Sequence, residues 1–118
     1  MLVEQDTDMI PNACNLPPEL QTSAIILGQE PAWRTRDVGE VIAWLAHHNL
    51  AVVGVEHWQE VQGFPKWIAS SNYNYEPIVV WKEYVHHCAE GAVAFVERFG
   101  AERDALFNLT WIGEQETV

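Results

Sequence analysis

The strongest hydrophobic pattern in the chain is helical and covers residues 81–99. Apolar side chains fall within one arc of a helix drawn through this segment, and charged or imidazole side chains take the opposite arc. The apolar set is Trp81, Tyr84, Val85, Cys88, Ala92, Phe95, Val96 and Phe99. Gly100 follows and is expected to end the helix as a left-handed cap. The spacing therefore predicts a long helix with one buried face.

A second helical pattern begins at Thr35, which is expected to cap the helix, and ends near Asn49. Its apolar residues repeat at the intervals that place them on one helix face turned toward a core. These residues are Val38, Val41, Ile42 and Leu45. The segment is predicted to be an amphipathic helix.

A weaker helical pattern begins at Pro17 and Pro18, which suit the start of a helix but cannot continue one. Gly28 is the expected end of this element. Because Ile25 and Ile26 interrupt its apolar face, the segment is predicted to be either a well-buried helix or a partly extended chain.

Two segments show strand patterns. Residues 50–56 are a short, apolar, β-branched run, which is typical of a strand buried on both faces. Residues 106–112 alternate, with Phe107, Leu109 and Trp111 on one side, and this predicts a half-exposed strand. The pattern leaves open whether the two strands pair in parallel, through a right-handed crossover, or antiparallel.

Residues 57–77 have no clear period and contain Gly63, Pro65 and Pro77. Part of this segment is expected to be extended, as an irregular pair of strands. A long structureless loop is uncommon in a compact domain unless it is functional.

Together these elements predict an α+β fold, a two-layer sandwich in which a small sheet packs against about three helices. Residues 1–15 are polar and acidic and are expected to form an N-terminal arm. Residues 16–118 are expected to form a single α+β domain, which the chain length of 118 residues supports.

The excess of acidic over basic residues indicates which kinds of molecule the protein can bind. Seventeen acidic residues against six scattered basic ones give a net charge of −11, which argues against nucleic acid and anionic membranes as partners and favours a basic protein. The N-terminus has no signal-peptide pattern, and no apolar run is long enough to span a membrane. Cys14 and Cys88 lack CxxC spacing. A cytoplasmic protein is expected.

The sequence offers little for catalysis. It has no nucleophile elbow and no phosphate-binding loop, and Cys88 falls on an apolar arc where a thiolate is unfavourable. His86 and His87 are adjacent and point about 100° apart on a helix. No enzymatic activity, cofactor or metal site is therefore expected. A small metal-dependent hydrolase that uses His57, His86 and His87 is the alternative.

The aromatic residues of the irregular segment are the best candidates for a binding site. Trp and Tyr are enriched at binding hot spots, and interleaved carboxylates would match a basic partner. The predicted binding residues are Glu56, Trp58, Glu60, Trp67, Tyr73, Tyr75 and Glu76. Glu56 is expected at the carboxyl end of its strand, where α/β folds commonly bind ligands. The other interpretation is that these rings form a satellite core beneath the segment.

The stretch from Trp33 to Trp58 contains W-x-x-x-D-V-x-x-V-I-x-x-L followed by A-V-V-G-V-E-H-W. It resembles a family of bacterial immunity proteins of α+β fold from polymorphic-toxin systems. In that family an apolar strand ends in a Gly-Gly-Asp-like motif, and Gly54-Val55-Glu56 stands in its place here. The segment Trp81-x-x-Tyr84-Val85 is similar to the final helix of the family. The resemblance covers about residues 20–112.

The resemblance implies that the protein binds and neutralises a cognate toxin, often a basic nuclease, in the cytosol of the producing cell. It brings no catalytic residues. The expected partner is a cognate basic protein toxin. A self-associating accessory domain, in which the same aromatic residues form a homodimer, is a further alternative.

Overall fold

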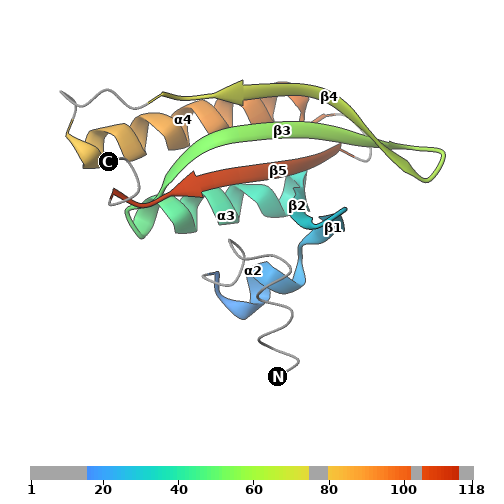
Figure 1. The fold of residues 1–118 in the computed structure, drawn as a ribbon, viewed down its shortest axis with the longest axis horizontal. Coiled ribbons are helices and arrows are strands. Elements are labelled where there is room, and N and C mark those ends of the chain that lie inside the picture. Colours follow the sequence, from blue (N-terminus) through green and yellow to red (C-terminus); the bar gives the residue numbers. More distant parts are fainter. Residues whose placement is uncertain (1–15, 75–79, 102–104, 115–118) are drawn as a thin grey trace.

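The computed structural model describes residues 16–74, 80–101 and 105–114. These residues form a five-stranded antiparallel sheet, with two long helices over one of its faces and a short helix beside them (Figure 1). The predicted two-layer α+β sandwich is confirmed. The N-terminal arm predicted for residues 1–15 lies outside the described residues.

Every neighbouring pair in the sheet is antiparallel, so the pairing that the sequence left open is settled. The strands follow the spatial order β1-β2-β5-β3-β4. Their bounds are β1 Ile25–Leu27, β2 Glu30–Arg34, β3 Ala51–Val61, β4 Phe64–Asn72 and β5 Ala105–Ile112.

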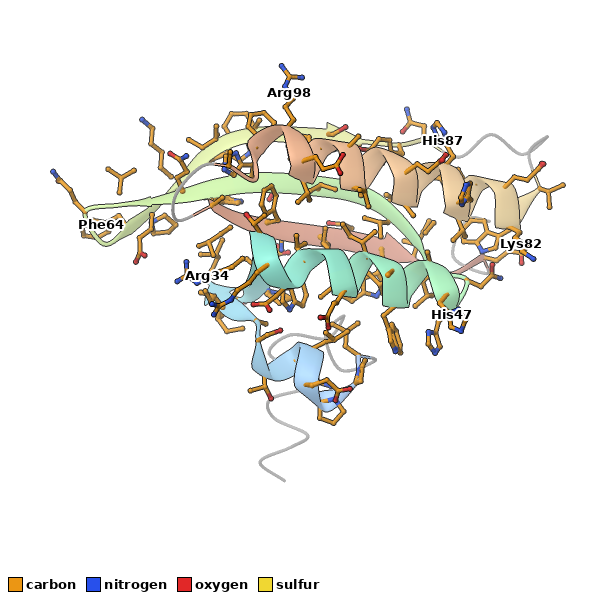
Figure 2. The ribbon with its side chains drawn as sticks, turned by 180° about the vertical axis from the view of Figure 1, so that it is seen from behind. Arg34, His47, Phe64, Lys82, His87 and Arg98 are labelled. Carbon is orange, nitrogen blue, oxygen red and sulfur yellow. The ribbon has the colours of Figure 1, made fainter. Side chains whose placement is uncertain are left out.

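The helices are α2 Pro18–Thr22, α3 Thr35–His47 and α4 Trp81–Phe99. The long helices α3 and α4 lie behind the sheet in Figure 1 and in front of it in Figure 2, so both cover the same face. The short helix α2 contacts α3. None of the helices in the described part of the chain combines the length and the apolar character needed to cross a membrane.

The core lies between the sheet and the two long helices. The apolar face predicted for α3 is buried as expected, and it packs with Phe107, Leu109 and Trp111 of β5. A second cluster surrounds Ala51, where the first half of α4 meets the start of β3. This cluster consists of Ala51, Trp81, Tyr84, Val85 and Cys88. The hydrophobic arcs read from the sequence thus fix which side of each helix faces the sheet.

The first helix is shorter than the apolar pattern suggests. It ends at Thr22, and Ile25–Leu27 instead form β1, the extended alternative for this segment. Gly28 then adopts a left-handed conformation (φ +66°) in the turn that leads into β2, a strand that the sequence did not predict.

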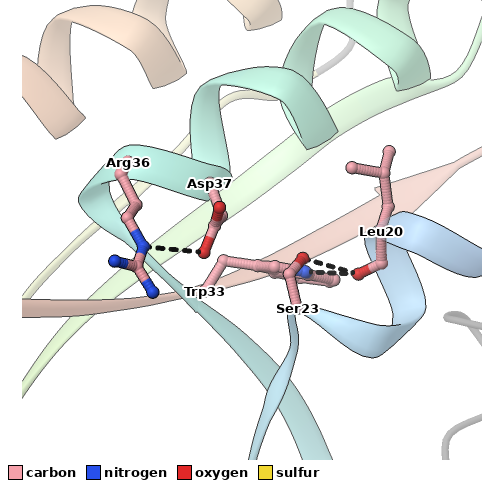
Figure 3. Close-up of polar contacts among 5 residues, drawn as sticks. All are labelled: Leu20, Ser23, Trp33, Arg36 and Asp37. Carbon is pink, nitrogen blue, oxygen red and sulfur yellow. Dashed lines mark hydrogen bonds and ion pairs between the residues drawn. The ribbon is translucent and has the colours of Figure 1, made fainter.

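Trp33 of β2 connects this region to the core (Figure 3). Its side chain is fully buried, and its indole Nε1 donates a hydrogen bond to the carbonyl oxygen of Leu20 at 2.9 Å. Ser23 Oγ donates to the same oxygen at 3.1 Å. Next to it, Arg36 and Asp37 form an ion pair at 3.6 Å. The aromatic residue that precedes α3 therefore ties α2 to the sheet.

Two predicted helix caps are wrong. Thr35 is the first residue of α3 and not its cap, and its Oγ1 donates instead to the carbonyl oxygen of Gly100 at 3.3 Å. Gly100 is right-handed (φ −71°). A small residue is needed there for a different reason, because a Cβ atom would lie 2.6 Å from the Val96 oxygen and 2.8 Å from Thr35 Cγ2.

β5 is more buried than a half-exposed strand. Its helix-facing residues are buried as expected, but Leu106 and Asn108 on the other side are also buried, at 3% and 5% exposure. Asn108 Nδ2 donates a hydrogen bond to the Pro31 carbonyl oxygen at 2.8 Å. β5 lies at the centre of the sheet between β2 and β3, which explains this burial.

Candidate functional site

The segment expected to be irregular is largely a regular β-hairpin formed by β3 and β4. Its turn consists of Gln62 and Gly63, which both have positive φ angles of 52° and 83°. Two consecutive residues of this kind form a type I′ turn, whose twist matches that of the flanking strands. The register shifts once between His57 and Trp58, which leaves Ile68 of β4 as a bulge. The turn and the bulge together hide the strand period in the sequence.

The register of the sheet places four long side chains in one row. Arg34 of β2 lies opposite Leu106 of β5, Leu106 lies opposite Trp58 of β3, and Trp58 lies opposite Trp67 of β4. Residues directly opposite each other in a sheet project from the same face. Because His57 and Phe107 pack in the core, this row projects from the other face, away from α3 and α4.

We call this surface the open face, and no described helix lies over it (Figure 1). Its main side chains are Arg34, Leu106, Trp58, Trp67, Glu56 and Glu60. Leu106 is buried and lies between Arg34 and Trp58 in the row. Trp67 is 50% exposed. The open face thus has an apolar centre and an accessible aromatic ring at one end.

Two carboxylates lie along β3 on either side of Trp58. Glu56 and Glu60 are each two residues away from it and project from the same face. The indole Nε1 of Trp58 donates a hydrogen bond to Glu56 Oε1 at 3.4 Å. Glu56 was expected at the end of its strand, which is wrong, because β3 continues to Val61. Its carboxylate is therefore held against an aromatic ring in the middle of a strand.

The end of the β3–β4 hairpin projects beyond the sheet (Figure 1). The pairing between β3 and β5 stops at Gln59, whereas β3 and β4 continue to pair as far as Val61 and Phe64. Phe64 is 75% exposed and lies at the tip (Figure 2). It is an accessible aromatic residue that the sequence reasoning did not single out. An apolar residue next to a two-residue turn was the signal that could have identified it.

Tyr73 was predicted to belong to the binding residues but does not lie on the open face. Its ring packs against α4, where a Cβ atom on Gly91 would be 2.7 Å from the ring, and it contacts His87 edge-on at 6.3 Å between ring centroids. Strand alternation explains this, because Tyr73 follows the open-face residue Asn72. Tyr75 and Glu76 lie outside the described residues.

The structure therefore brings together Glu56, Trp58, Glu60 and Trp67, and separates Tyr73 from them. Of the two interpretations of the aromatic residues, the satellite core applies to Tyr73, which packs against both core clusters. Trp67 remains accessible.

The histidines of the alternative metal site do not meet. His57 is fully buried, with Phe99 at 4.8 Å and Phe107 at 5.2 Å between ring centroids. Phe99 is about 18 Å along α4 from His87 at the usual helical rise. His86 is exposed and pairs with Glu90 at 3.4 Å. In the described ranges, no group of three or more His, Cys, Asp and Glu side chains is arranged to hold a metal ion.

Cys88 is expected to resist thiol reagents in the folded protein. Its side chain is fully buried, and burial raises the pKa of the Cys88 thiol above its ordinary value of 9.0. Because the thiolate is the reactive form, reaction with a disulfide reagent at pH 8 should be slower by about tenfold or more than in the unfolded chain. The measurement uses a Cys14→Ser variant with and without denaturant. Equal rates would contradict the burial of this thiol.

The same shift predicts a dependence of stability on pH. The folded state retains the Cys88 proton more strongly than the unfolded state does. The free energy of unfolding should therefore not depend on this group well below pH 9.0, and should decrease as the pH rises above that value. Burial also raises the pKa of Tyr84, which acts in the same direction.

Comparison of the chain with protein-family models, with curated proteins and with solved structures found no match. The open face must therefore be interpreted from its own chemistry. It combines the half-exposed Trp67, the neighbouring Trp58 and the buried Leu106 with two carboxylates, on the sheet face away from the long helices. Such a surface is suited to binding another protein.

Proposed function

We propose that this chain is a toxin-neutralising immunity protein that binds a cognate basic toxin domain through its open face. The observation that supports this most is the row of Arg34, Leu106, Trp58 and Trp67 across four strands, on the face that no described helix covers. Aromatic residues are enriched in protein–protein interfaces, and Trp67 of this row is half exposed. Phe64 is exposed at the tip of the hairpin, but it alternates with Pro65 and so projects from the opposite side to Trp67.

The charge of the chain supports a basic partner. The net charge is −11, and Glu56 and Glu60 lie beside the aromatic residues on the open face. Lys66 of the same hairpin is opposite Gln59 in the register and so projects from the other side. An acidic surface around an apolar centre accelerates association with a basic protein and disfavours acidic ones.

The sequence pattern from Trp33 to Trp58 supports the class of partner. Its resemblance to immunity proteins of polymorphic-toxin systems implies a toxin as the bound protein. In the fold, this stretch covers the end of β2, all of α3 and most of β3, and so it includes the strand that carries Glu56 and Trp58.

Co-expression with the neighbouring toxin domain tests the proposal. The gene beside that of this chain is expected to encode a large secreted protein with a variable C-terminal domain. That domain should stop growth when expressed alone, and this chain should restore growth and co-purify with the domain as a one-to-one complex. Continued toxicity without a complex, or a neighbourhood of metabolic genes, would contradict the proposal.

A further inference from the structure

The turn of the β3–β4 hairpin determines how closely Trp58 and Trp67 approach each other. In a hairpin with a type I′ turn, the residues that flank the turn, here Val61 and Phe64, exchange both backbone hydrogen bonds. Pairs then alternate along the ladder, so Glu60 and Pro65 form a non-hydrogen-bonded pair, which suits a proline without an N–H group.

Counting on from that pair, Trp58 and Trp67 also form a non-hydrogen-bonded pair. Their Cβ atoms are therefore about 4.5–5.5 Å apart, and both indoles stand on the open face. Trp67 is half exposed, so the pair is accessible from the side of β4.

The two carboxylates frame this pair along the strand. Glu56 and Glu60 lie about 7 Å from Trp58, one on each side, at the usual rise of a strand. Glu56 is already oriented by the hydrogen bond from the Trp58 indole, and Glu60 is exposed. An incoming group thus meets two neighbouring indole side chains, with a carboxylate side chain on each side of Trp58 along the strand.

We propose that Trp58, Trp67, Glu56 and Glu60 bind the guanidinium group of an arginine side chain of the partner protein. This inference rests on the proposed function and specifies the chemistry of the same face. A guanidinium is planar, stacks on indole rings and donates paired hydrogen bonds to carboxylates. A lysine ammonium is a more strongly hydrated point charge and uses the ring faces and the two carboxylates less well.

Arg34 determines the direction from which this arginine approaches. It belongs to the same row but is two strands away from Trp58, at about 10 Å, with Leu106 between them. In the described part of the chain, Arg98 lies over the Phe99 ring at 5.4 Å, and no arginine forms such a cation–π contact with Trp58 or Trp67. The cation on Arg34 repels a second cation near β5, so the arginine of the partner enters over β3 and β4.

Titration with a single amino-acid probe tests the site without the partner. The probe is N-acetyl-arginine methylamide, and the readout is the set of indole N–H resonances in a two-dimensional NMR spectrum, assigned with Trp58→Phe and Trp67→Phe. The resonances of Trp58 and Trp67 should shift saturably at millimolar probe. The resonance of the fully buried Trp33 should not move and serves as an internal control.

Matched probes and variants show whether binding depends on the charge of the probe or on its shape. The citrulline analogue, which is neutral and of nearly the same shape, should produce no saturable shift, and the lysine analogue should bind more weakly than arginine. Glu56→Gln and Glu60→Gln should each weaken binding of the arginine probe by about two- to fivefold, as expected for an exposed charge pair. Glu97→Gln on α4, on the opposite layer, should leave the affinity unchanged.

The inference is overturned if all exposed indoles shift alike without saturation, or if both glutamine variants bind the arginine probe as the native chain does. These outcomes are distinct from failure of the proposed function, which is absence of a complex with the neighbouring toxin domain. If the complex forms normally but the resonances of Trp58 and Trp67 do not respond to the arginine probe, the proposed function stands and only the guanidinium site is ruled out.

Discussion

Replacement of Trp33 by alanine is expected to lower the free energy of unfolding by about 3–5 kcal/mol, the largest effect of any single substitution proposed for this chain. The Trp33 ring is fully buried and lies 6.4 Å from the Trp111 ring between centroids. Its removal leaves a cavity between β2, β5 and α2, and it breaks the hydrogen bond to Leu20. Denaturant unfolding followed by circular dichroism measures the change.

Trp33→Phe is the matched control for this substitution. It keeps most of the ring volume and loses the indole N–H, while Ser23 still donates to the Leu20 oxygen. The loss should therefore be clearly smaller than for alanine. If Trp33→Ala lowered the stability by less than about 1 kcal/mol, Trp33 would not be the residue that ties α2 to the sheet.

Replacement of Trp67 by alanine is expected to have the opposite profile, with a large effect on binding and a small one on folding. Because the side chain is 50% exposed on an edge strand, stability should change by less than about 1 kcal/mol. Loss of an aromatic hot spot should weaken the proposed complex with a toxin domain by about 2 kcal/mol or more, which is about 30-fold in the dissociation constant. Calorimetric titration measures this.

Val93→Ala is the control for the Trp67 prediction. Val93 is 41% exposed on α4, and α4 covers the sheet face opposite to the open face. Its truncation should leave the affinity unchanged. If Val93→Ala weakened the complex while Trp67→Ala did not, the toxin domain would bind the helical layer and the assignment of the open face would be wrong.

The parts of the fold that were predictable from the sequence are those in which one element buries one regular face. The arcs of α3 and α4 depend on a period that survives over several turns, and both helices were predicted correctly. β2 was missed because it has only five residues, which include a proline and an arginine. Its burial depends on pairing with β5, which is far away in the sequence.

The candidate site was predictable in its residue types but not in its geometry. Trp58, Trp67, Glu56 and Glu60 were singled out for their chemistry, and the fold gathers them on one face. That gathering depends on the turn at Gln62 and Gly63, where glutamine is not a usual type I′ residue. The same register turned Tyr73 toward α4, which no local pattern reveals.

The bulge at Ile68 also affects whether copies of the chain can aggregate through the edge of the sheet. β4 is the long edge strand of the sheet, and an edge of this kind is a template on which further strands can stack into open-ended aggregates. In β4 the template is broken by Pro65, by the charge on Lys66 and by the bulge. The accessible tryptophan thus lies on a strand that resists fibre growth, and the chain is expected to form no fibrillar aggregates at high concentration.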